Sequence, residues 1–473
     1  MKWKNRRNVL IAIGVTMLMT ACSGGASPAG GSGEVHREGE DVAPASDGSA
    51  AGKIPVTVSV MENTRFLQQA EAAFEQANPG IDIQIQSYVA TPDSKGPVMR
   101  TVGDSIDAAT LEKYRTSVNT ELMSGKGADL IAVESLAYEK YAERGMFVDL
   151  TDRMRQDASM KPEELNAGVL EGVKVNGLQA ALPIHYNLDM TVGNEKLLSD
   201  AGILVDDRTW TWQELLQSGE QAIASQPGAA RAILAGVTPE DLLARIVQSE
   251  FDRYVDASAK TANFANDSFV ALLQEIKRLS DAGLIDGNPE MAMQDMDVFK
   301  SMQLKRPMEL FMFPKVAYRG TGKVYWAPGG GESQGVTYDS ELMLAMNRNS
   351  KVQEEAWSFL SFLLSEQMQS QPSMDGYPIR KASLKTMLNQ FVEMLSKGQI
   401  RMAGPSGDTP PAPTEAEIDA VVALAEQVGA FAGSDPQIMN MVKEEAASFF
   451  GGAASAEDAA ELIQNRVGTY LNE

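Results

Sequence analysis

The chain has 473 residues, of which 44% are hydrophobic and 22% are charged, and its formal net charge at pH 7 is −23. These proportions are typical of a soluble globular protein, and the length allows two or three domains with ordinary cores. So acidic a surface repels nucleic acid and anionic lipid headgroups, which argues against nucleic acid as a partner.

Residues 1–21 have the pattern of a signal peptide. Four cationic side chains precede a short apolar run, residues 9–19, which is too brief to span a membrane as a mature helix. The run ends in Leu18-Met19-Thr20-Ala21-Cys22, which resembles the lipobox of bacterial lipoproteins, whose cysteine is acylated and becomes the mature N-terminus. Cys22 is the only cysteine, so no intrachain disulfide is possible.

Residues 22–52 predict a lipidated cysteine followed by a flexible linker. The segment is rich in Gly, Ser, Ala and Pro and has almost nothing apolar enough to fold. Removing residues 1–21, which carry four positive and no negative side chains, leaves a mature chain near −27. We expect an anchor, a tether and a globular body, in that order.

The body opens with a pattern that predicts a β-α-β unit. Residues 54–60 alternate valine with other residues, as in a strand, and residues 64–77 place apolar side chains at helical spacing. Asn78-Pro79-Gly80 ends the helix, because proline disfavours helix before it and glycine permits the turn. Residues 81–85 then alternate isoleucine in a second strand. Such a unit requires a right-handed crossover and a parallel sheet.

The same alternation of elements continues, and helices dominate toward the end of the chain. The next predicted elements are a helix at 108–123, a short strand at 129–133 and a helix at 136–144. Two candidate capping boxes, Ser350 with Gln353 and Thr414 with Glu417, precede late helices. Early strands and late helices predict an α/β protein with a helical C-terminal region.

Several segments, taken in order, resemble the extracellular solute-binding proteins of the maltose-binding-protein-like group. Their order and spacing from Ile54 to Glu473, behind a lipobox, are most similar to the lipoprotein sugar-binders of Gram-positive bacteria. The matching segments are Ala73–Ile81, Gly127–Val133, Arg144–Leu150, Leu182-Pro183 with Asn194, Thr209–Leu216, Glu354–Gln369, Gly376–Arg380 and Ser455–Ala460.

The resemblance implies a two-lobed, type II periplasmic-binding-protein-like fold, with hinge-crossing strands and a ligand between the lobes. Lobe one would comprise residues 53–182 and 333–375, and lobe two residues 187–330 and 378–473. It also implies a substrate-binding lipoprotein of an ABC importer, held by its lipid on the extracytoplasmic face of the cell membrane. The expected partners are a small-molecule ligand and the permease subunits, and we expect a monomer without cofactor or metal.

A sugar between two lobes needs flat aromatic faces for its C–H surfaces and carboxylates or amides for its hydroxyls. In α/β sheets such groups sit at the C-terminal ends of strands. Residues at these positions, where family members often place ligand contacts, are Glu62, Asn63, Glu134, Ser135, His185, Tyr186, Asn187, Phe313, Trp326 and Tyr377.

Most of these residues have a structural interpretation beside the functional one. Strand alternation puts the Trp326 ring either in the core or in the cleft, and Phe313 fits a core position better. Glu134 suits the N-cap of the helix that follows it, and a lone histidine such as His185 is more often structural. Asn187 is the strongest candidate, because an amide at the crossing can hold a hydroxyl from both sides.

The expected ligand is a mono- or oligosaccharide, with another small solute, a peptide or a polyol, as the alternative. Maltose-binding proteins carry a tryptophan and an Asp-Arg pair near the 129–133 strand. This chain has Val133, Leu136 and Ala137 there. The departure argues against a maltodextrin.

No enzymatic motif has the partners that its chemistry needs. Gly331–Gly335 fits Gly-x-Ser-x-Gly, but His36 and His185 both precede it, whereas α/β-hydrolases place histidine last. Two histidines and one cysteine do not build a usual zinc site. We therefore predict a protein that is not an enzyme. A carboxylate-dependent glycoside hydrolase is the leading enzymatic alternative, because Asp and Glu total 64, and a surface adhesin is a third class.

Overall fold

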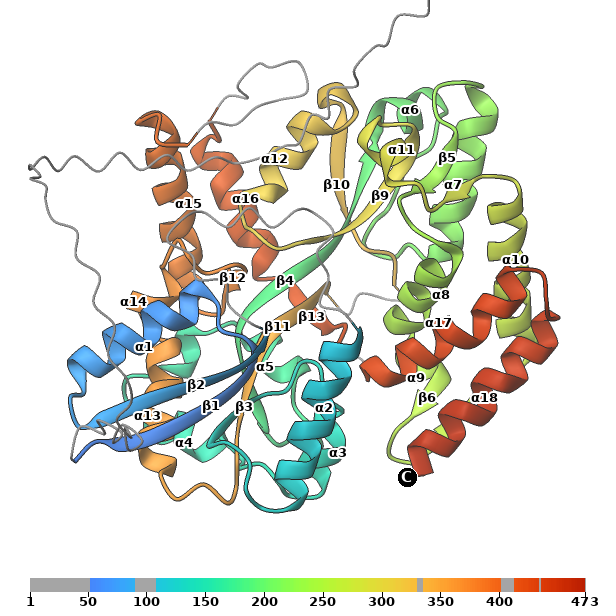
Figure 1. Cartoon of the computed structure of the whole chain (residues 1–473). Helices are drawn as coiled ribbons and strands as arrows, with labels where there is room; N and C mark the ends of the chain where they lie inside the picture. Colours follow the sequence, from blue (N-terminus) through green and yellow to red (C-terminus); the bar gives the residue numbers. More distant parts are fainter. Residues whose placement is uncertain (1–51, 90–107, 330–334, 401–411, 434, 473) are drawn as a thin grey trace, which may run out of the picture.

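The computed structural model describes residues 52–89, 108–329, 335–400, 412–433 and 435–472 (Figure 1). It opens with β1 (Ile54–Glu62), α1 (Arg65–Ala77) and β2 (Ile81–Val89), and β1 and β2 pair in parallel. Thr64 caps α1 by accepting a hydrogen bond from the Leu67 N–H at 3.3 Å. The predicted β-α-β unit is confirmed. The predicted signal peptide, Cys22, residues 22–51 and Ser333 lie outside the described residues.

Eleven of the described strands form one mixed sheet in the order β2-β1-β3-β11-β4-β9-β5-β8, with β10 and β12 also paired to β4, and β13 paired to β11. The two remaining strands, β6 (Val255–Asp256) and β7 (Thr261–Ala262), form a small ribbon. The other strands are β3 (Leu130–Ala132), β4 (Ala181–Asn194), β5 (Ala232–Ala235), β8 (Ile285–Asp286), β9 (Asp297–Leu304), β10 (Gly322–Trp326), β11 (Val336–Met346), β12 (Tyr377–Pro378) and β13 (Val428–Phe431).

Two hydrophobic cores lie at the two ends of this sheet, and together they make the fold two-lobed (Figure 1). The first core surrounds β1, β3, β11 and most of β4, under α2 (Ala108–Met123), α3 (Tyr138–Glu143), α4 (Thr151–Gln156), α5 (Ala167–Gly172), α13 (Gln353–Leu363) and α14 (Glu366–Gln369). The second surrounds β5 and the start of β9, under α6 (Glu195–Asp200), α7 (Trp212–Ser225), α8 (Pro239–Ser249), α9 (Phe251–Tyr254) and α10 (Asp267–Asp281). The short α11 (Pro289–Met293) lies beside β5 and β9.

The helical C-terminal region is present, and it divides between the two cores. The side chains of α15 (Lys381–Ser396) and α16 (Glu415–Ala425) pack in the first core, as do those of α12 (Glu309–Val316). Those of α17 (Pro436–Phe450) and α18 (Ala456–Asn472) pack in the second. The predicted second segment of lobe two, residues 378–473, thus contains helices that pack in both cores.

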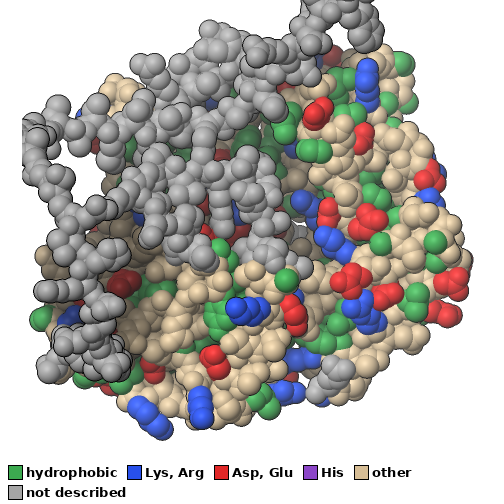
Figure 2. Space-filling model, viewed as in Figure 1, with side chains coloured by type: hydrophobic (Ala, Val, Ile, Leu, Met, Phe, Trp, Pro, Cys, Tyr) green, Lys and Arg blue, Asp and Glu red, His purple; other side chains and the backbone are tan. Residues whose placement is uncertain are grey.

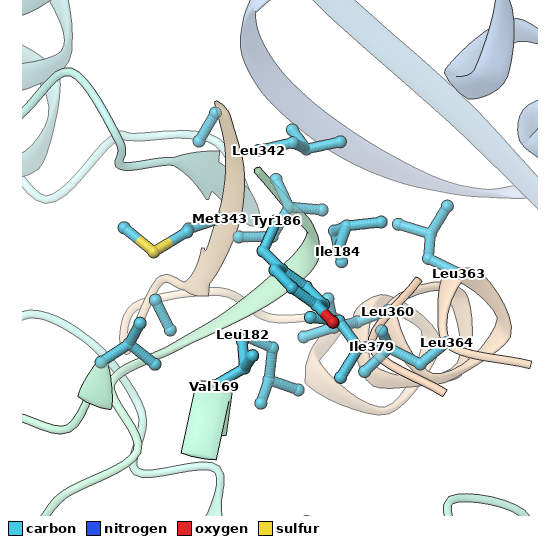
Figure 3. Close-up of a cluster of buried hydrophobic side chains, with 14 of the residues drawn as sticks. Val169, Leu182, Ile184, Tyr186, Leu342, Met343, Leu360, Leu363, Leu364 and Ile379 are labelled. Atoms are coloured by element: carbon cyan, nitrogen blue, oxygen red, sulfur yellow. The ribbon is translucent and has the colours of Figure 1, made fainter. Parts of the chain in front are cut away.

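The first core covers one face of β4, as Figure 3 shows. Tyr186 lies among Ile184, Leu360 and Ile379, and its ring centroid is 5.4 Å from that of Tyr377. Burying one such aromatic ring removes 150–250 Å² of surface from water, so this packing makes β4 a stiff support. Two short 3-10 helices, η1 (Pro162–Glu164) and η2 (Ala317–Gly320), complete the described elements.

Of the two capping boxes predicted from local sequence, one is present in the structure and one is not. Thr414 and Glu417 form the predicted capping box of α16, with both reciprocal hydrogen bonds present. The box predicted at Ser350 is wrong, because the Ser350 hydroxyl donates to Asp129 Oδ1 at 2.7 Å and α13 begins after Val352 without a side-chain cap. Within the described segments, no helix combines the length and hydropathy that a membrane span requires.

Candidate functional site

The strands that pass between the two cores present a polar face. Side chains alternate along β4, so Asn187 and Asp189 lie on the face opposite the buried Tyr186 and Leu188. The register puts Asp339 of β11 opposite Asn187, and Gln303 of β9 opposite Asp189. Gln303 Nε2 donates to Asp339 Oδ2 at 3.5 Å. Four polar side chains from three strands therefore meet on one surface.

Asn187 is the most unusual member of this surface. Its side chain is 0% exposed, and neither the amide nitrogen nor the amide oxygen has a hydrogen-bond partner. An unsatisfied buried polar group costs about 1–3 kcal/mol, and the great majority of buried polar groups in folded proteins have partners. A ligand with both donors and acceptors, such as a hydroxyl, would satisfy this amide.

Glu134 joins the polar face from the end of β3. The Met343 N–H donates to Glu134 Oε2 at 3.3 Å, and Glu134 and Asp339 line one cavity. The interpretation of Glu134 as a helix cap is wrong, because α3 starts after Ala137 with no side-chain cap. Ser135, the next residue, contributes its carbonyl oxygen as acceptor for Arg115 Nε at 2.8 Å.

Burial and mutual repulsion raise the pKa values of the carboxyls on this face. Burial is the main cause, and it raises the pKa of Glu134 to about 8, that of Asp189 to about 7 and that of Asp339 to about 6. The negative charge of Asp339 adds to the pKa increase of both Glu134 and Asp189. These groups therefore change charge near neutral pH.

A small cavity of about 10 Å³, room for about one water molecule, adjoins Glu134 and Asp339 in this conformer. It lies between α3 and the segment that joins β13 to α17, and its lining includes carboxylates, two aromatic rings and apolar side chains. The lining residues are Glu134, Leu136, Ala137, Tyr138, Glu139, Asp339, Met343, Phe431, Gly433 and Asp435. Burial, followed by the charge of Asp435, raises the pKa of Glu139 to about 7.

The two lobes touch beside this cavity. Lys140 of α3 donates from Nζ to the backbone oxygen of Tyr470 at 2.8 Å, and Nζ lies 3.6 Å from the Tyr470 ring centroid. The Tyr470 hydroxyl in turn donates to Asp435 Oδ2 at 2.7 Å. The contact joins a helix of the first core to a helix of the second, so the structure is a conformer in which the lobes are in contact.

The predicted site residues at the ends of β1 and β4 are placed as follows. Glu62 and Asn63 lie at the same sheet edge as Glu134, because β1 and β3 are parallel. Asn63 is half-buried, and its Oδ1 lacks a partner. His185 is 8% exposed and lies against Gly376, and burial lowers its imidazole pKa. Its Nδ1 also has no partner.

The predicted aromatic residues do not gather around Asn187. Tyr186 and Tyr377 pack against each other in the first core, on the other face of β4. Trp326 is 7% exposed in the same core, and the Arg208 guanidinium lies 4.0 Å from its ring centroid. Phe313 is half-buried in α12, on the side of the first core. The rings of these four residues therefore serve packing in this conformer.

Sequence reasoning missed two carboxylates, those of Asp189 and Asp339, that share the polar face with Asn187, and two more in the cavity lining, Glu139 and Asp435. Asp189 could have been predicted, because it lies two residues after Asn187 and residues two apart in a strand share a face. The sequence gives no comparable indication for Asp339, Glu139 and Asp435, because strand register and interlobe packing bring them to the site. Among the described residues no group of three His, Cys, Asp or Glu side chains has the arrangement of a metal site.

A two-lobed α/β fold with a polar surface on its crossing strands defines a class of ligand-binding proteins. The sequence profile described as "Bacterial extracellular solute-binding protein" matches residues 59–370, about two thirds of the chain. The chain belongs to this family. Its members are bacterial extracellular solute-binding proteins, as the resemblance predicted.

Solved structures with the same fold support the assignment. The sugar-binding protein MalE from Xanthomonas citri has a TM-score of 0.59 at 15% identity, over 89% of this chain and 98% of its own. The ABC substrate-binding protein Lmo0181 from Listeria monocytogenes, in complex with cycloalternan, has 0.56 at 15% identity, over 89% and 99%. A solute-binding protein from Thermotoga lettingae bound to α-D-tagatose has 0.52 at 15% identity, over 88% and 99%. At such identities the similarity shows the fold.

Proposed function

We propose that this protein is the substrate-binding lipoprotein of an ABC importer and captures a mono- or oligosaccharide between its lobes. The observation that carries the proposal is the buried, unpartnered amide of Asn187, on a strand that runs from one core to the other. Carboxylates on the same face offer acceptors for sugar hydroxyls. Structures of the same fold with bound carbohydrates, cycloalternan and tagatose, support the ligand class.

Ligand capture works by closure of the lobes over the polar face of β4. Lys140 and Tyr470 meet across the lobes only when the lobes are in contact, so this pair stabilises the closed form. A ligand shifts the equilibrium toward closure if it binds the closed form better than the open form. Contacts to both lobes, with Glu134 on one side and Asp435 on the other, would provide that difference.

A binding screen of the full mature chain tests the ligand class. Carbohydrates, peptides and polyols are compared by thermal shift, and a true ligand at 100 times its Kd adds about 2.7 kcal/mol of apparent stability. Asn187→Ala should remove the shift, while the exposed-site control Asn465→Ala should retain it. Binding of peptides alone would overturn carbohydrate capture, and release of reducing sugar from an oligosaccharide would indicate a glycoside hydrolase instead.

The lipid anchor is a separate part of the proposal. Cys22 follows the lipobox-like sequence and would carry the acyl groups, palmitate included, on the outer face of the membrane, as on a Gram-positive cell surface. We expect Cys22→Ala to release the protein into the medium, measured by immunoblot of cell and medium fractions. Membrane retention of the variant would contradict lipidation at this residue.

A further inference from the structure

The carboxylates of the polar face are buried acidic groups that form no ion pair. None of the ion pairs formed by described residues includes Glu134, Asp189 or Asp339, and the residues that line the cavity include no Lys, Arg or His. On the face shown in Figure 2, acidic and basic side chains are interspersed over the second lobe. The polar face of the crossing strands is therefore an exception within a protein that otherwise pairs many of its charges.

Arg245 and Lys305 are near enough to lower the pKa values of Asp189 and Asp339, respectively, against the larger effect of burial, but neither forms an ion pair with them. Arg245 donates from Nη1 to Ser301 Oγ at 2.9 Å, and Lys305 pairs with the exposed Glu341. A buried carboxylate in the second lobe shows the alternative arrangement, since Asp297 is 0% exposed and lies 2.6 Å from Lys300 Nζ. The same fold thus pairs one buried carboxylate with a lysine and leaves those of the polar face without an ion pair.

We propose that the cleft selects a carbohydrate that bears a protonated amino group, with Asp339 and Asp189 as its counter-charges; this inference rests on the proposed function. Asn187, opposite Asp339 and without a partner of its own, then holds a neighbouring hydroxyl. An ammonium donates three hydrogen bonds, and charge-assisted hydrogen bonds are about twice as strong as neutral ones. A metal ion fits less well, because the described residues form no metal site.

The test compares amine and acetamide forms of one sugar by calorimetry at pH 7. Short β-1,4-linked glucosamine oligomers are titrated into the full mature chain, beside their N-acetylated counterparts and glucose oligomers of equal length. The amine form should bind at least about tenfold more tightly, because one unpaired charge gains a partner. Equal or tighter binding of the neutral sugars would overturn the amine preference and leave carbohydrate capture intact. If none of these sugars binds, the result contradicts both the amine preference and carbohydrate capture.

Two variants show whether the carboxylates cause the preference. Asp339→Asn, and independently Asp189→Asn, should reduce the amine preference to within about threefold, because the amine form loses more affinity than the neutral sugars do. Glu220→Gln removes the same charge from a surface pair with Arg278 and should leave the preference unchanged. A thermal melt of each variant shows whether it folds. If one of the two variants is misfolded, the other still tests the proposal. An unchanged preference in a folded Asp339→Asn protein would overturn the proposal.

Discussion

The two faces of β4 have different roles, although their residues alternate along one strand. On the core face, Tyr186 and Leu188 are buried, and the rings of Tyr338 and Tyr377 lie beside that of Tyr186. Figure 3 shows Tyr186 among aliphatic side chains of the first core. On the polar face, Asn187 has no hydrogen-bond partner and Asp189 is buried without an ion pair. The packed face stabilises the fold, and the unsatisfied face stores free energy that a ligand can release. The comparison teaches that stability and binding are separated by strand alternation.

The largest effect is expected on the packed face. Tyr186→Ala removes a fully buried ring from the first core, and we expect it to lower the free energy of unfolding by about 3–5 kcal/mol. Chemical denaturation of the ligand-free protein measures this. A matched change of an exposed side chain, Leu204→Ala, should cost less than about 0.5 kcal/mol. A loss below about 1 kcal/mol in Tyr186→Ala would mean that this face does not support the fold.

A second effect concerns the pH dependence of the polar face. Glu134, Asp189 and Asp339 have raised pKa values, so the folded state binds more protons than the unfolded state between about pH 4 and 8. Stability therefore falls as pH rises through this window. Asp339→Asn should flatten the fall by roughly 1–2 kcal/mol between pH 4 and 7, measured by denaturation at both pH values. The exposed Glu461→Gln should change nothing, and an equally steep fall in Asp339→Asn would contradict the assignment.

A third effect sharpens the link between the polar face and closure. Lys140→Met removes the charge that rests on the Tyr470 ring, and we expect it to favour the open form by about 1 kcal/mol. The radius of gyration from small-angle scattering should rise, and the Kd for a bound sugar should rise about fivefold. Lys385→Met breaks an ion pair with Asp419 between two helices of the first core and serves as control. A closed, tightly binding Lys140→Met protein would exclude this pair as a closing contact.

The smallest effect on stability should come from the centre of the site. Asn187→Ala removes an amide that has no partner, so the free energy of unfolding should stay within about 1 kcal/mol of the original value. Ligand binding should nevertheless be lost, which separates this variant from Tyr186→Ala. Urea denaturation measures the stability of this variant, and calorimetry on the same sample measures its ligand binding. A loss of more than about 2 kcal/mol would show that Asn187 serves the fold.

Local sequence was sufficient for much of the architecture. The alternating valines of β1, the helical spacing of α1 and the turn at Asn78-Pro79-Gly80 each depend on neighbours within one or two turns of the chain. The capping box of α16 formed for the same reason, since both of its residues lie within four positions. The family resemblance placed Asn187 at a lobe crossing, and the structure puts it on β4, while its role in binding stays a prediction.

Long-range packing decided what local patterns left open. Ser350 donates to Asp129, a partner 221 positions earlier, and so it does not cap α13. Asp339 lies opposite Asn187 only through the register of β11 on β4, and Glu134 reaches the same cavity from β3. Backbone geometry is set by short-range sterics, whereas register, burial and the charge around a site depend on residues that meet only after the chain has folded.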